Sequence, residues 1–447
     1  MRRALFVSLL ILVAFAVQAQ GYRGRDFWIC FPQNAVLEES SHVLQLSVYI
    51  TAGSRATGTI TNLLDSTTQN FTVEYGASIE RDIDTEIEIR SSERTQKNSI
   101  HITSDQDISV YVVDHRPAST DSYMAIPTEY LGKEYVVAGY TALVAGTYSF
   151  TSQATIAATD DNTLVSIHLT NVTQEGLPKG RTLMFPLNRG ETFQVQGSHD
   201  GRVGGDLTGS TVTATKPIAF FTGHTCAQVP PTATFCDMLL EMEPPANDWG
   251  DSFILTKFEG KDYYVARVMA NADLTEVSIN GVKAATLKRG EFYEIDTFYH
   301  DAIITTSRPA LVAQYCTSSD ADTVKVGDPF MLLAVPNDRF IKETTTTSVV
   351  DARFEHYLNI VVPDSGVNSL KIDGMLVAPG KFPPIGISIA SERKLPAANS
   401  TVFSLRVPTG RHLVQCNAPV AVYSYGFGFG DNNYDSYGHA CGIRLDK

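Results

Sequence analysis

The C-terminal part of the sequence holds aromatic side chains separated by glycine, asparagine and aspartate. Rigid aromatic rings in such a setting can stack on sugar rings or anchor a protein partner, because they offer contact area at a small entropic cost. The series makes six residues candidates for ligand binding: Tyr425, Phe427, Phe429, Asn432, Tyr434 and Tyr437. The same spacing also fits one face of a buried strand, so both interpretations stay open.

The sequence holds 6 cysteines, whose chemistry depends on the compartment in which the protein folds. Residues 1–19 contain Arg2 and Arg3, then an apolar stretch that ends at a small residue, Ala19, which is typical of a cleavable signal peptide. We therefore expect a secreted or periplasmic protein without a membrane anchor. In such an oxidising compartment an even number of cysteines favours disulfides.

Two cysteine pairs are candidates for disulfides. Cys226 and Cys236 bracket a short loop with two prolines, so a local bridge between them is our first expectation. Cys30 lies in the first expected strand and Cys441 lies near the last residue, so a bridge between them would join the two ends of the chain. Zinc is disfavoured because no close Cys-x-x-Cys or His-x-x-x-His companion is present.

Catalytic and metal-binding motifs are mostly missing. The sequence has no Gly-x-Ser-x-Gly elbow, no His-Glu-x-x-His, no phosphate-binding loop and no dinucleotide fingerprint. His224 and Cys226 could pair as base and nucleophile, but a strand-end histidine beside a disulfide cysteine is the favoured interpretation. Acidic turns such as Asp160-Asp-Asn162 could bind calcium, although ordinary Asx turns are favoured. We predict no enzyme, metal or cofactor; a secreted hydrolase is the less favoured alternative.

The elements that would position these residues are β-strands. Short runs of β-branched and aromatic residues are broken by Gly, Pro, Asn and Asp about every ten residues, as around Leu44–Ile50 and Ile108–Val112. Helical periodicity is nearly absent. The pattern predicts an all-β fold.

Several motifs recur at long intervals along the chain. A turn of the form Leu-x-Arg-Gly-Glu occurs at 187–191 and again at 287–291. A motif that begins with aspartate occurs at four positions: Asp121, Asp237, Asp328 and Asp435. A turn into a strand is anchored at four others: Asp107, Pro217, Pro309 and Pro419.

The repeats divide the mature chain into four units of about 100 residues, 20–131, 132–249, 250–340 and 341–447. A unit with roughly six to eight short strands has the size of a β-sandwich, so four tandem sandwiches are the expected architecture. Half a unit has the size of a propeller blade, so a closed, propeller-like ring is the alternative. A disulfide between Cys30 and Cys441 would favour the ring.

An ordered series of motifs runs through nearly the whole mature chain, and its most specific stretch is 206–250. It includes Gly24-Arg-Asp-Phe27, Asp121-Ser-Tyr-Met-Ala-Ile-Pro127, Ala158-Thr-Asp-Asp-Asn-Thr163, Gly223-His-Thr-Cys226 and Trp249-Gly250. In this series the sequence resembles the N-terminal domain of the IgGFc-binding protein family, and it looks like a secreted bacterial member. The resemblance implies a non-catalytic binding or adhesion protein; a carbohydrate-binding module is the alternative.

The overall charge narrows the class of partner. With 35 Lys and Arg against 49 Asp and Glu, the formal net charge is −14. No broad basic surface is therefore available for nucleic acid or an anionic membrane. We expect an extracellular protein or glycoprotein partner, with glycans as a second class of ligand.

Overall fold

The computed structural model describes residues 22–35, 43–141, 143–145, 148–198, 205–349, 353–377, 386–430 and 434–446. The expected signal peptide, 1–19, lies outside this part. The described chain is built of β-strands, and its helical segments are short 3-10 turns, so the all-β prediction is confirmed. This part contains no helix with the length and apolar character needed to cross a membrane.

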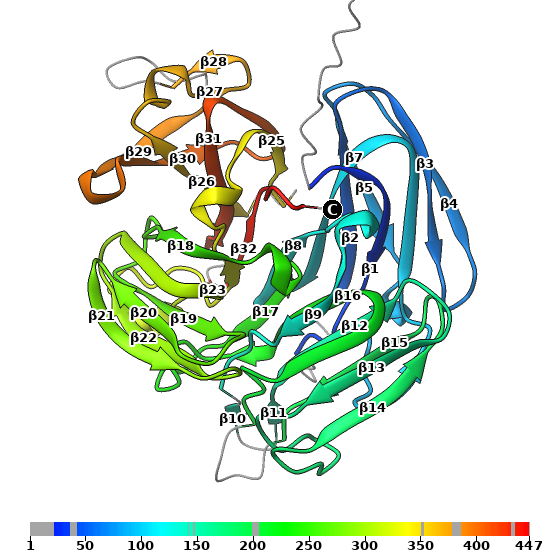
Figure 1. Cartoon of the computed structure of the whole chain (residues 1–447). Helices are drawn as coiled ribbons and strands as arrows, with labels where there is room; N and C mark the ends of the chain where they lie inside the picture. The colour runs from blue at the N-terminus through cyan, green and yellow to red at the C-terminus, as the bar shows by residue number, and fades with distance from the viewer. Residues whose placement is uncertain are drawn as a thin grey trace, which may run out of the picture.

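Four large sheets follow one another along the chain (Figure 1), and we call them units 1 to 4. Unit 1 contains β1 (Gly24–Ile29), β2 (Gln45–Ala52), β3 (Ala56–Asn62), β4 (Thr68–Val73), β5 (Ser78–Ile83), β7 (Ile100–Arg116) and β8 (Ser119–Met124). Unit 2 contains β9 (Gly132–Val136), β12 (Ser152–Ala158), β13 (Thr163–His168), β14 (Thr182–Leu187), β15 (Thr192–Gln196), β16 (Thr211–Ala227) and β17 (Asp237–Met242). Its edge is extended by β6 (Thr95–Gln96), which precedes β7 in the chain, and β10 (Leu143–Ala145) pairs with β11 (Tyr148–Phe150) in a separate hairpin.

The second half of the chain repeats this arrangement. Unit 3 contains β18 (Gly250–Leu255), β19 (Tyr264–Ala270), β20 (Thr275–Ile279), β21 (Val282–Leu287), β22 (Phe292–Phe298), β23 (Ala302–Cys316) and β24 (Met331–Leu333). Unit 4 contains β25 (Ile341–Thr347), β26 (Phe354–Pro363), β27 (Lys371–Ile372), β28 (Met375–Leu376), β29 (Ser388–Leu395), β30 (Ser400–Val407), β31 (Arg411–Gly428) and β32 (Ser436–Ala440).

One long strand organises each unit: β7, β16, β23 or β31. Its first half pairs with β3, β13, β20 or β27, and its second half pairs with β2, β12, β19 or β26. The long strand also pairs with the first strand of its unit, and this pairing shifts register between the two halves, so that several residues of the long strand have no partner in the first strand. The repeated anchors lie among these residues: Asp107, Pro217, Pro309 and Pro419. Because proline has no amide hydrogen, the ladder is interrupted there, and an irregular register bends a strand.

The glycine that begins a unit is required by packing. Added Cβ atoms would lie 2.3 to 2.5 Å from a proline side-chain carbon in three pairs: Gly24 with Pro127, Gly132 with Pro245, and Gly250 with Pro336. Each proline precedes a 3-10 turn that leads into the next unit: η2 (Thr128–Tyr130), η3 (Ala246–Asp248) and η5 (Asn337–Arg339). The repeated glycine therefore lets the first strand of a unit pack against the proline near the end of the same unit.

The four units close into a ring (Figure 1). The last strands of the units are neighbours around its axis: β8 contacts β17 and β32, and β24 also contacts both. Unit 4 meets unit 1 where the Tyr22 hydroxyl donates to the Glu343 carbonyl and the Tyr111 hydroxyl donates to the Thr345 carbonyl. The structure therefore combines the two architectures that the sequence left open, since curled sheets of sandwich size form a closed ring.

A single carboxyl group joins all four units at the axis. Asp121 of β8 is fully buried and accepts four backbone N–H groups. Its Oδ2 accepts from Leu240 of unit 2 at 2.8 Å and Met331 of unit 3 at 3.3 Å. Its Oδ1 accepts from Ser122 of unit 1 at 2.8 Å and Gly438 of unit 4 at 3.2 Å. Burial raises the pKa of Asp121, and the four N–H groups oppose that shift.

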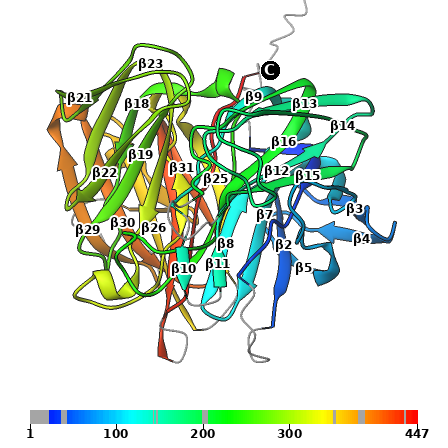
Figure 2. The ribbon, with the colours of Figure 1, turned by 90° about the horizontal axis from the view of Figure 1, so that it is seen from below.

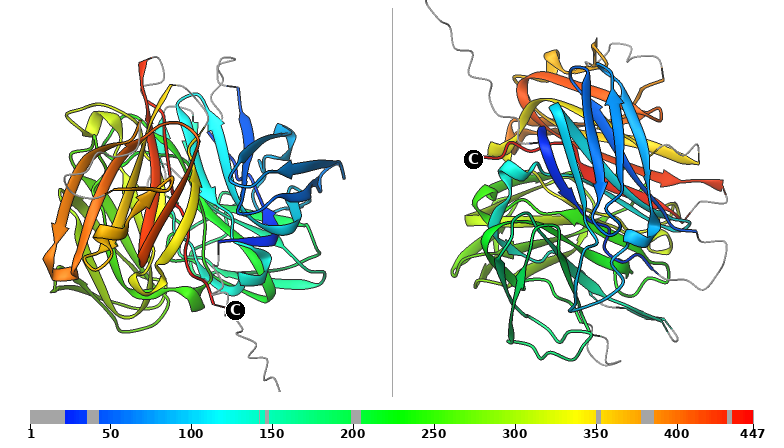
Figure 3. Two further views of the ribbon diagram at one scale, coloured as in Figure 1. Left: turned by 90° about the horizontal axis from the view of Figure 1, so that it is seen from above. Right: turned by 90° about the vertical axis from the view of Figure 1, so that its right-hand side faces the viewer.

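The residues after β32 cover one end of the ring. Arg339 of η5 pairs with Asp446 and, at 3.3 Å, with Asp248 of η3. Leu445 is buried beside them. Figures 2 and 3 show the C-terminus on one side of the ring and the far end of β31 on the other. The opposite end of the ring is therefore formed by the turns that lead into the last strand of each unit.

Substituting Asp121 tests this axial junction. We expect Asp121→Asn to lower the free energy of unfolding by about 2–5 kcal/mol, because an amide nitrogen in place of either oxygen would face two N–H donors. Urea titration followed by tryptophan fluorescence measures the change. Asp251→Asn, on an exposed carboxylate of β18, is the control and should shift stability by less than about 0.5 kcal/mol. Equal stability of the two variants would contradict the proposed role of Asp121.

Candidate binding face

Four turns meet at the end of the ring away from the C-terminus. Each joins a long strand to the last strand of the same unit, and together they comprise residues 117–118, 228–236, 317–330 and the described part of 429–435. We call this surface the loop face. Its turns bind one another: Ser318 N–H donates to the Val229 carbonyl at 2.7 Å, and Thr234 N–H donates to Asp320 at 2.9 Å. The turns of units 2 and 3 are therefore bonded to each other.

The predicted disulfide between Cys226 and Cys236 is confirmed. It joins the end of β16 to the residue before β17, with a Cα–Cα distance of 5.2 Å. A bridge that closes a loop of this size contributes about 3 kcal/mol, mainly by restricting the unfolded chain. It also fixes the base of the 228–236 turn.

Three aromatic side chains are exposed on the loop face. Phe235, Phe429 and Tyr434 are 39%, 46% and 44% exposed. Phe235 of unit 2 stacks on Tyr434 of unit 4, with ring centroids 4.8 Å apart and an angle of 28° between the planes. The disulfide closes the loop that carries Phe235, and the stacked pair is an exposed apolar feature of the kind that anchors protein partners.

Phe235 was not among the residues that sequence reasoning singled out. Its one signal is its position directly before Cys236 at the end of a proline-containing loop. Its stacking partner belongs to a unit almost 200 residues away in the chain, and a single sequence carries no trace of that contact.

Three other candidates of the aromatic series are in the core, which corrects the prediction that they bind a ligand at the surface. Tyr425 and Tyr437 are fully buried, and Phe427 is 4% exposed. Phe429 and Tyr434 lie on the loop face, as described above. Asn432 lies outside the described residues.

The burial of these rings has a physical cause: both faces of β31 are covered. Tyr425 stacks on Tyr357 of the neighbouring strand, and its hydroxyl accepts the Glu259 N–H of unit 3 at 3.0 Å. A Cβ at Gly426 would lie 2.5 Å from a ring carbon of Tyr437, so this glycine makes room for that ring. Rings that alternate with glycine here mark a strand between two packed layers.

The second predicted disulfide is wrong, because Cys30 and Cys441 are both free, buried thiols. They belong to different hydrophobic clusters. Cys30 bonds through its backbone to the Tyr123 hydroxyl, whereas the Cys441 thiol donates to Thr346 at 3.1 Å. Burial raises the pKa of Cys441 to about 12, so this thiol stays protonated at neutral pH. The ring is closed by packing and hydrogen bonds instead.

His224 and Cys226 do not form a base and nucleophile pair. Cys226 has no thiol because it is bonded to Cys236. His224 is fully buried, its Nδ1 accepts the Cys226 N–H at 3.1 Å, and burial lowers its pKa to about 3. The described residues include no group of three or more His, Cys, Asp or Glu side chains that could hold a metal ion.

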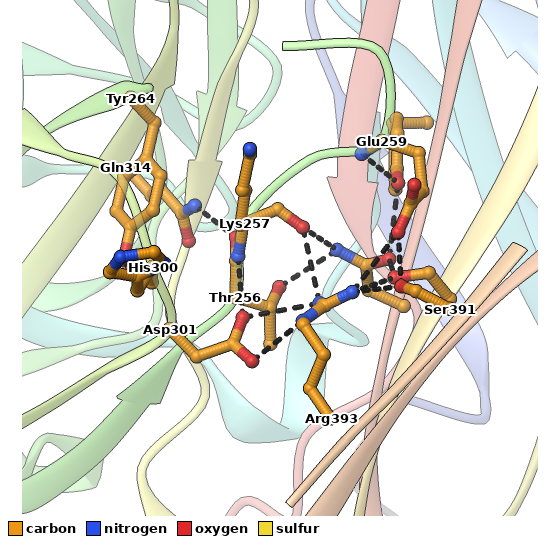
Figure 4. Close-up of polar contacts among 12 residues, drawn as sticks. Thr256, Lys257, Glu259, Tyr264, His300, Asp301, Gln314, Ser391 and Arg393 are labelled. Atoms are coloured by element: carbon orange, nitrogen blue, oxygen red, sulfur yellow. Dashed lines mark hydrogen bonds and ion pairs between the residues drawn. The ribbon is translucent and has the colours of Figure 1, made fainter. Parts of the chain in front are cut away.

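A polar network supports the unit 3 side of the loop face (Figure 4). Arg393 of β29 crosses from unit 4 and pairs with Asp301 at 2.7 Å and with Glu259 at 3.0 Å. Its guanidinium also donates to the Lys257 carbonyl at 3.3 Å, while Asp301 accepts the Lys257 N–H at 2.8 Å. One arginine therefore holds the 256–263 loop against the 299–301 turn.

The aspartates of the repeated motif converge near the axis. Asp237 is fully buried, and its pKa is raised by burial and then by the charges of Asp435, Asp328 and Asp121. Burial also raises the pKa of Asp328 to about 6, although that carboxylate accepts the Ser319 N–H at 2.8 Å. The repeat therefore places carboxyl groups from all four units around one dry region.

The fold and the loop face define an all-β repeat protein with an exposed aromatic pair built by units 2 and 4. The chain belongs to the IgGFc-binding protein family, because the family model described as IgGFc binding protein matches residues 121–426. The chain is also similar to the IgGFc-binding protein of Homo sapiens, with 28% identity over 261 residues. That match covers 57% of this chain but 4% of the human protein, so the chain corresponds to a small part of that relative.

Among solved structures, the chain was matched to the tetra-tandem repeat in the extending region of a large adhesion protein. The identity is 11%, the match covers 93% of this chain and 98% of the other, and the TM-score is 0.09.

Removing the Arg393 side chain tests the network in Figure 4. We expect Arg393→Met to lower the free energy of unfolding by about 3 kcal/mol, because it leaves the nearly buried Asp301 without its counter-charge. Arg406→Met removes the exposed pair with Glu355 and should cost less than about 1 kcal/mol. Urea titration measures both values. Similar losses in the two variants would show that the network adds nothing beyond a surface pair.

The raised pKa of Asp328 predicts an unusual pH dependence. A carboxyl group with a raised pKa binds its proton more tightly in the folded state, so stability is lost as pH rises from about 4 through about 6. Asp328→Asn mimics the protonated group and should therefore be more stable than the wild type above pH 7, by up to about 3 kcal/mol, with little difference at pH 4. Thermal unfolding midpoints across this range provide the measurement. A variant less stable than the wild type at pH 7.5 would refute the assignment.

Proposed function

We propose that this protein binds an extracellular protein or glycoprotein through the loop face, without catalysis. The observation that carries the proposal is the stacked pair of Phe235 and Tyr434, exposed at the end of the ring and held by two different units. Binding hot spots are commonly aromatic side chains whose position is fixed before the partner arrives.

The surroundings of the pair support the same proposal. The loops that carry it are short turns on a closed scaffold, an arrangement that lets loops vary while the framework stays rigid. Exposed rings beside Gly, Ser, Thr and Asn resemble the composition of antibody binding loops, which combine rigid aromatic anchors with adaptable polar contacts. We further propose that the protein acts outside the cytoplasm, as its first 19 residues and its disulfide suggest.

The family suggests the first partner to test. The human relative is named for binding the Fc region of immunoglobulin G, and the part of it that matches this chain is short. We therefore propose an Fc fragment as a candidate ligand of the loop face, with other extracellular glycoproteins of the same environment as further candidates.

Surface plasmon resonance with an immobilised human Fc fragment tests the proposal. We expect saturable binding by the wild type and at least a tenfold weaker Kd for the double variant Phe235→Ser, Tyr434→Ser, since the pair supplies the apolar anchor. Tyr75→Ser is the matched control, because Tyr75 is 78% exposed in unit 1. Unchanged affinity of the double variant would place the contact away from the loop face, and absence of saturable binding would exclude Fc.

A further inference from the structure

A hollow with a volume of 910 Å³ lies between units 2 and 3. One wall is formed by residues 168–171, 179–180, 206, 208–209 and 211 of unit 2, and the other by residues 287 and 289–292 of unit 3. The hollow and the loop face lie at opposite ends of β19, because Gly290 bonds to Ala270, the last residue of that strand. This volume is in the range of pockets that hold small ligands.

The repeated Leu-x-Arg-Gly-Glu turn packs differently at the two boundaries between units where it occurs. Between units 1 and 2 the turn packs against a large ring: a Cβ at Gly190 would lie 3.5 Å from Trp28, and the Arg189 guanidinium lies over the same ring at 5.3 Å. Between units 2 and 3 a Cβ at Gly209 would lie 1.9 Å from the carbonyl oxygen of Gly290. At the boundary between units 2 and 3 the turn therefore meets another backbone, whereas at the boundary between units 1 and 2 it meets an aromatic side chain.

The acidic residues of the hollow are already used by the protein. Asp206 accepts a hydrogen bond from the buried Arg267 at 2.8 Å. Glu291 accepts the Lys288 N–H at 2.8 Å and so closes its own turn. The charge of Asp206 is thus balanced by Arg267 and opposes an incoming anion less than a free carboxylate would, whereas Glu291 keeps its negative charge.

The basic residues of the hollow are not used in this way. Lys179 and Arg289 are exposed, and neither forms an ion pair with a described residue. Arg289 donates through Nε to the Asn271 side chain at 3.1 Å, which orients the guanidinium while its charge remains available. Lys179 and Arg289 are therefore two exposed cations that an anionic group entering the hollow can reach, in a protein whose net charge is −14.

The remaining lining residues favour a ligand larger than an inorganic ion. Leu287 and Phe292 line the hollow beside the cations, and the Phe292 ring is backed by the Arg267 guanidinium at 4.5 Å. Apolar and aromatic side chains suit the C–H face of a sugar ring, and His168 offers a further polar contact. An arginine fork matches a carboxylate or sulfate group in geometry as well as charge.

We infer that this hollow binds an acidic sugar, a saccharide that carries a carboxylate or a sulfate group, with Lys179 and Arg289 holding the anionic group. The site is separate from the loop face and does not depend on the protein partner proposed above. It gives the chain a second, chemically different ligand.

Isothermal titration calorimetry with the whole protein tests the inference. The probes are N-acetylneuraminic acid, galactose 6-sulfate, neutral galactose and sodium sulfate. We expect both acidic sugars to bind at least tenfold more tightly than galactose and than inorganic sulfate. Equal affinity for galactose, equal affinity for sulfate, or no binding of either acidic sugar at millimolar concentration would overturn the inference.

Matched variants locate the site. The double variant Lys179→Met, Arg289→Met should weaken binding of the acidic sugars at least tenfold, and both side chains are exposed, so we expect the protein to fold. Arg189→Met changes the equivalent residue of the repeated turn, which lies over Trp28, and should leave the affinity unchanged. An equal loss in the Arg189 variant, or no loss in the double variant, would refute the site.

Discussion

The fold depends on satisfying backbone N–H groups in the dry region where four units meet. Asp121 meets this requirement with one side chain, because its two oxygens accept N–H groups from units 1, 2, 3 and 4. Buried N–H groups without acceptors would each cost about 1–3 kcal/mol. The carboxyl group thus links the last strand of every unit, and the ring can close without a covalent bond between its ends.

The ring in turn creates the surfaces on which function would depend. Because the last strands are gathered at the axis, the turns that precede them are brought to one end, where Phe235 and Tyr434 meet from units 2 and 4. The boundaries between units are chemically different: Arg267 joins units 2 and 3, and Arg393 joins units 3 and 4. Near-equivalent units therefore leave unequal gaps, and the hollow beside Arg289 is one of them.

Local constraints made part of this structure predictable from sequence. The Cys226–Cys236 loop acts within a few residues, so its bridge could be predicted. The prolines were expected in turns that precede a strand; they lie instead within the long strands, where the ladder with the first strand of the unit is interrupted. Contacts between units could not be, since the periodicity of β31 is the same whether its second face meets solvent or another unit. The surface and core interpretations of Tyr425 and Tyr437 therefore both stayed open, and the pairing of Arg393 with Asp301 had no sequence signal.

In a closed ring, the four units unfold together rather than as four independent domains. Differential scanning calorimetry of the intact chain tests it most directly, because the calorimetric and van't Hoff enthalpies agree only when the whole chain unfolds in one step. We expect one transition with equal enthalpies. Two or more transitions, or a calorimetric enthalpy several times the van't Hoff value, would contradict it.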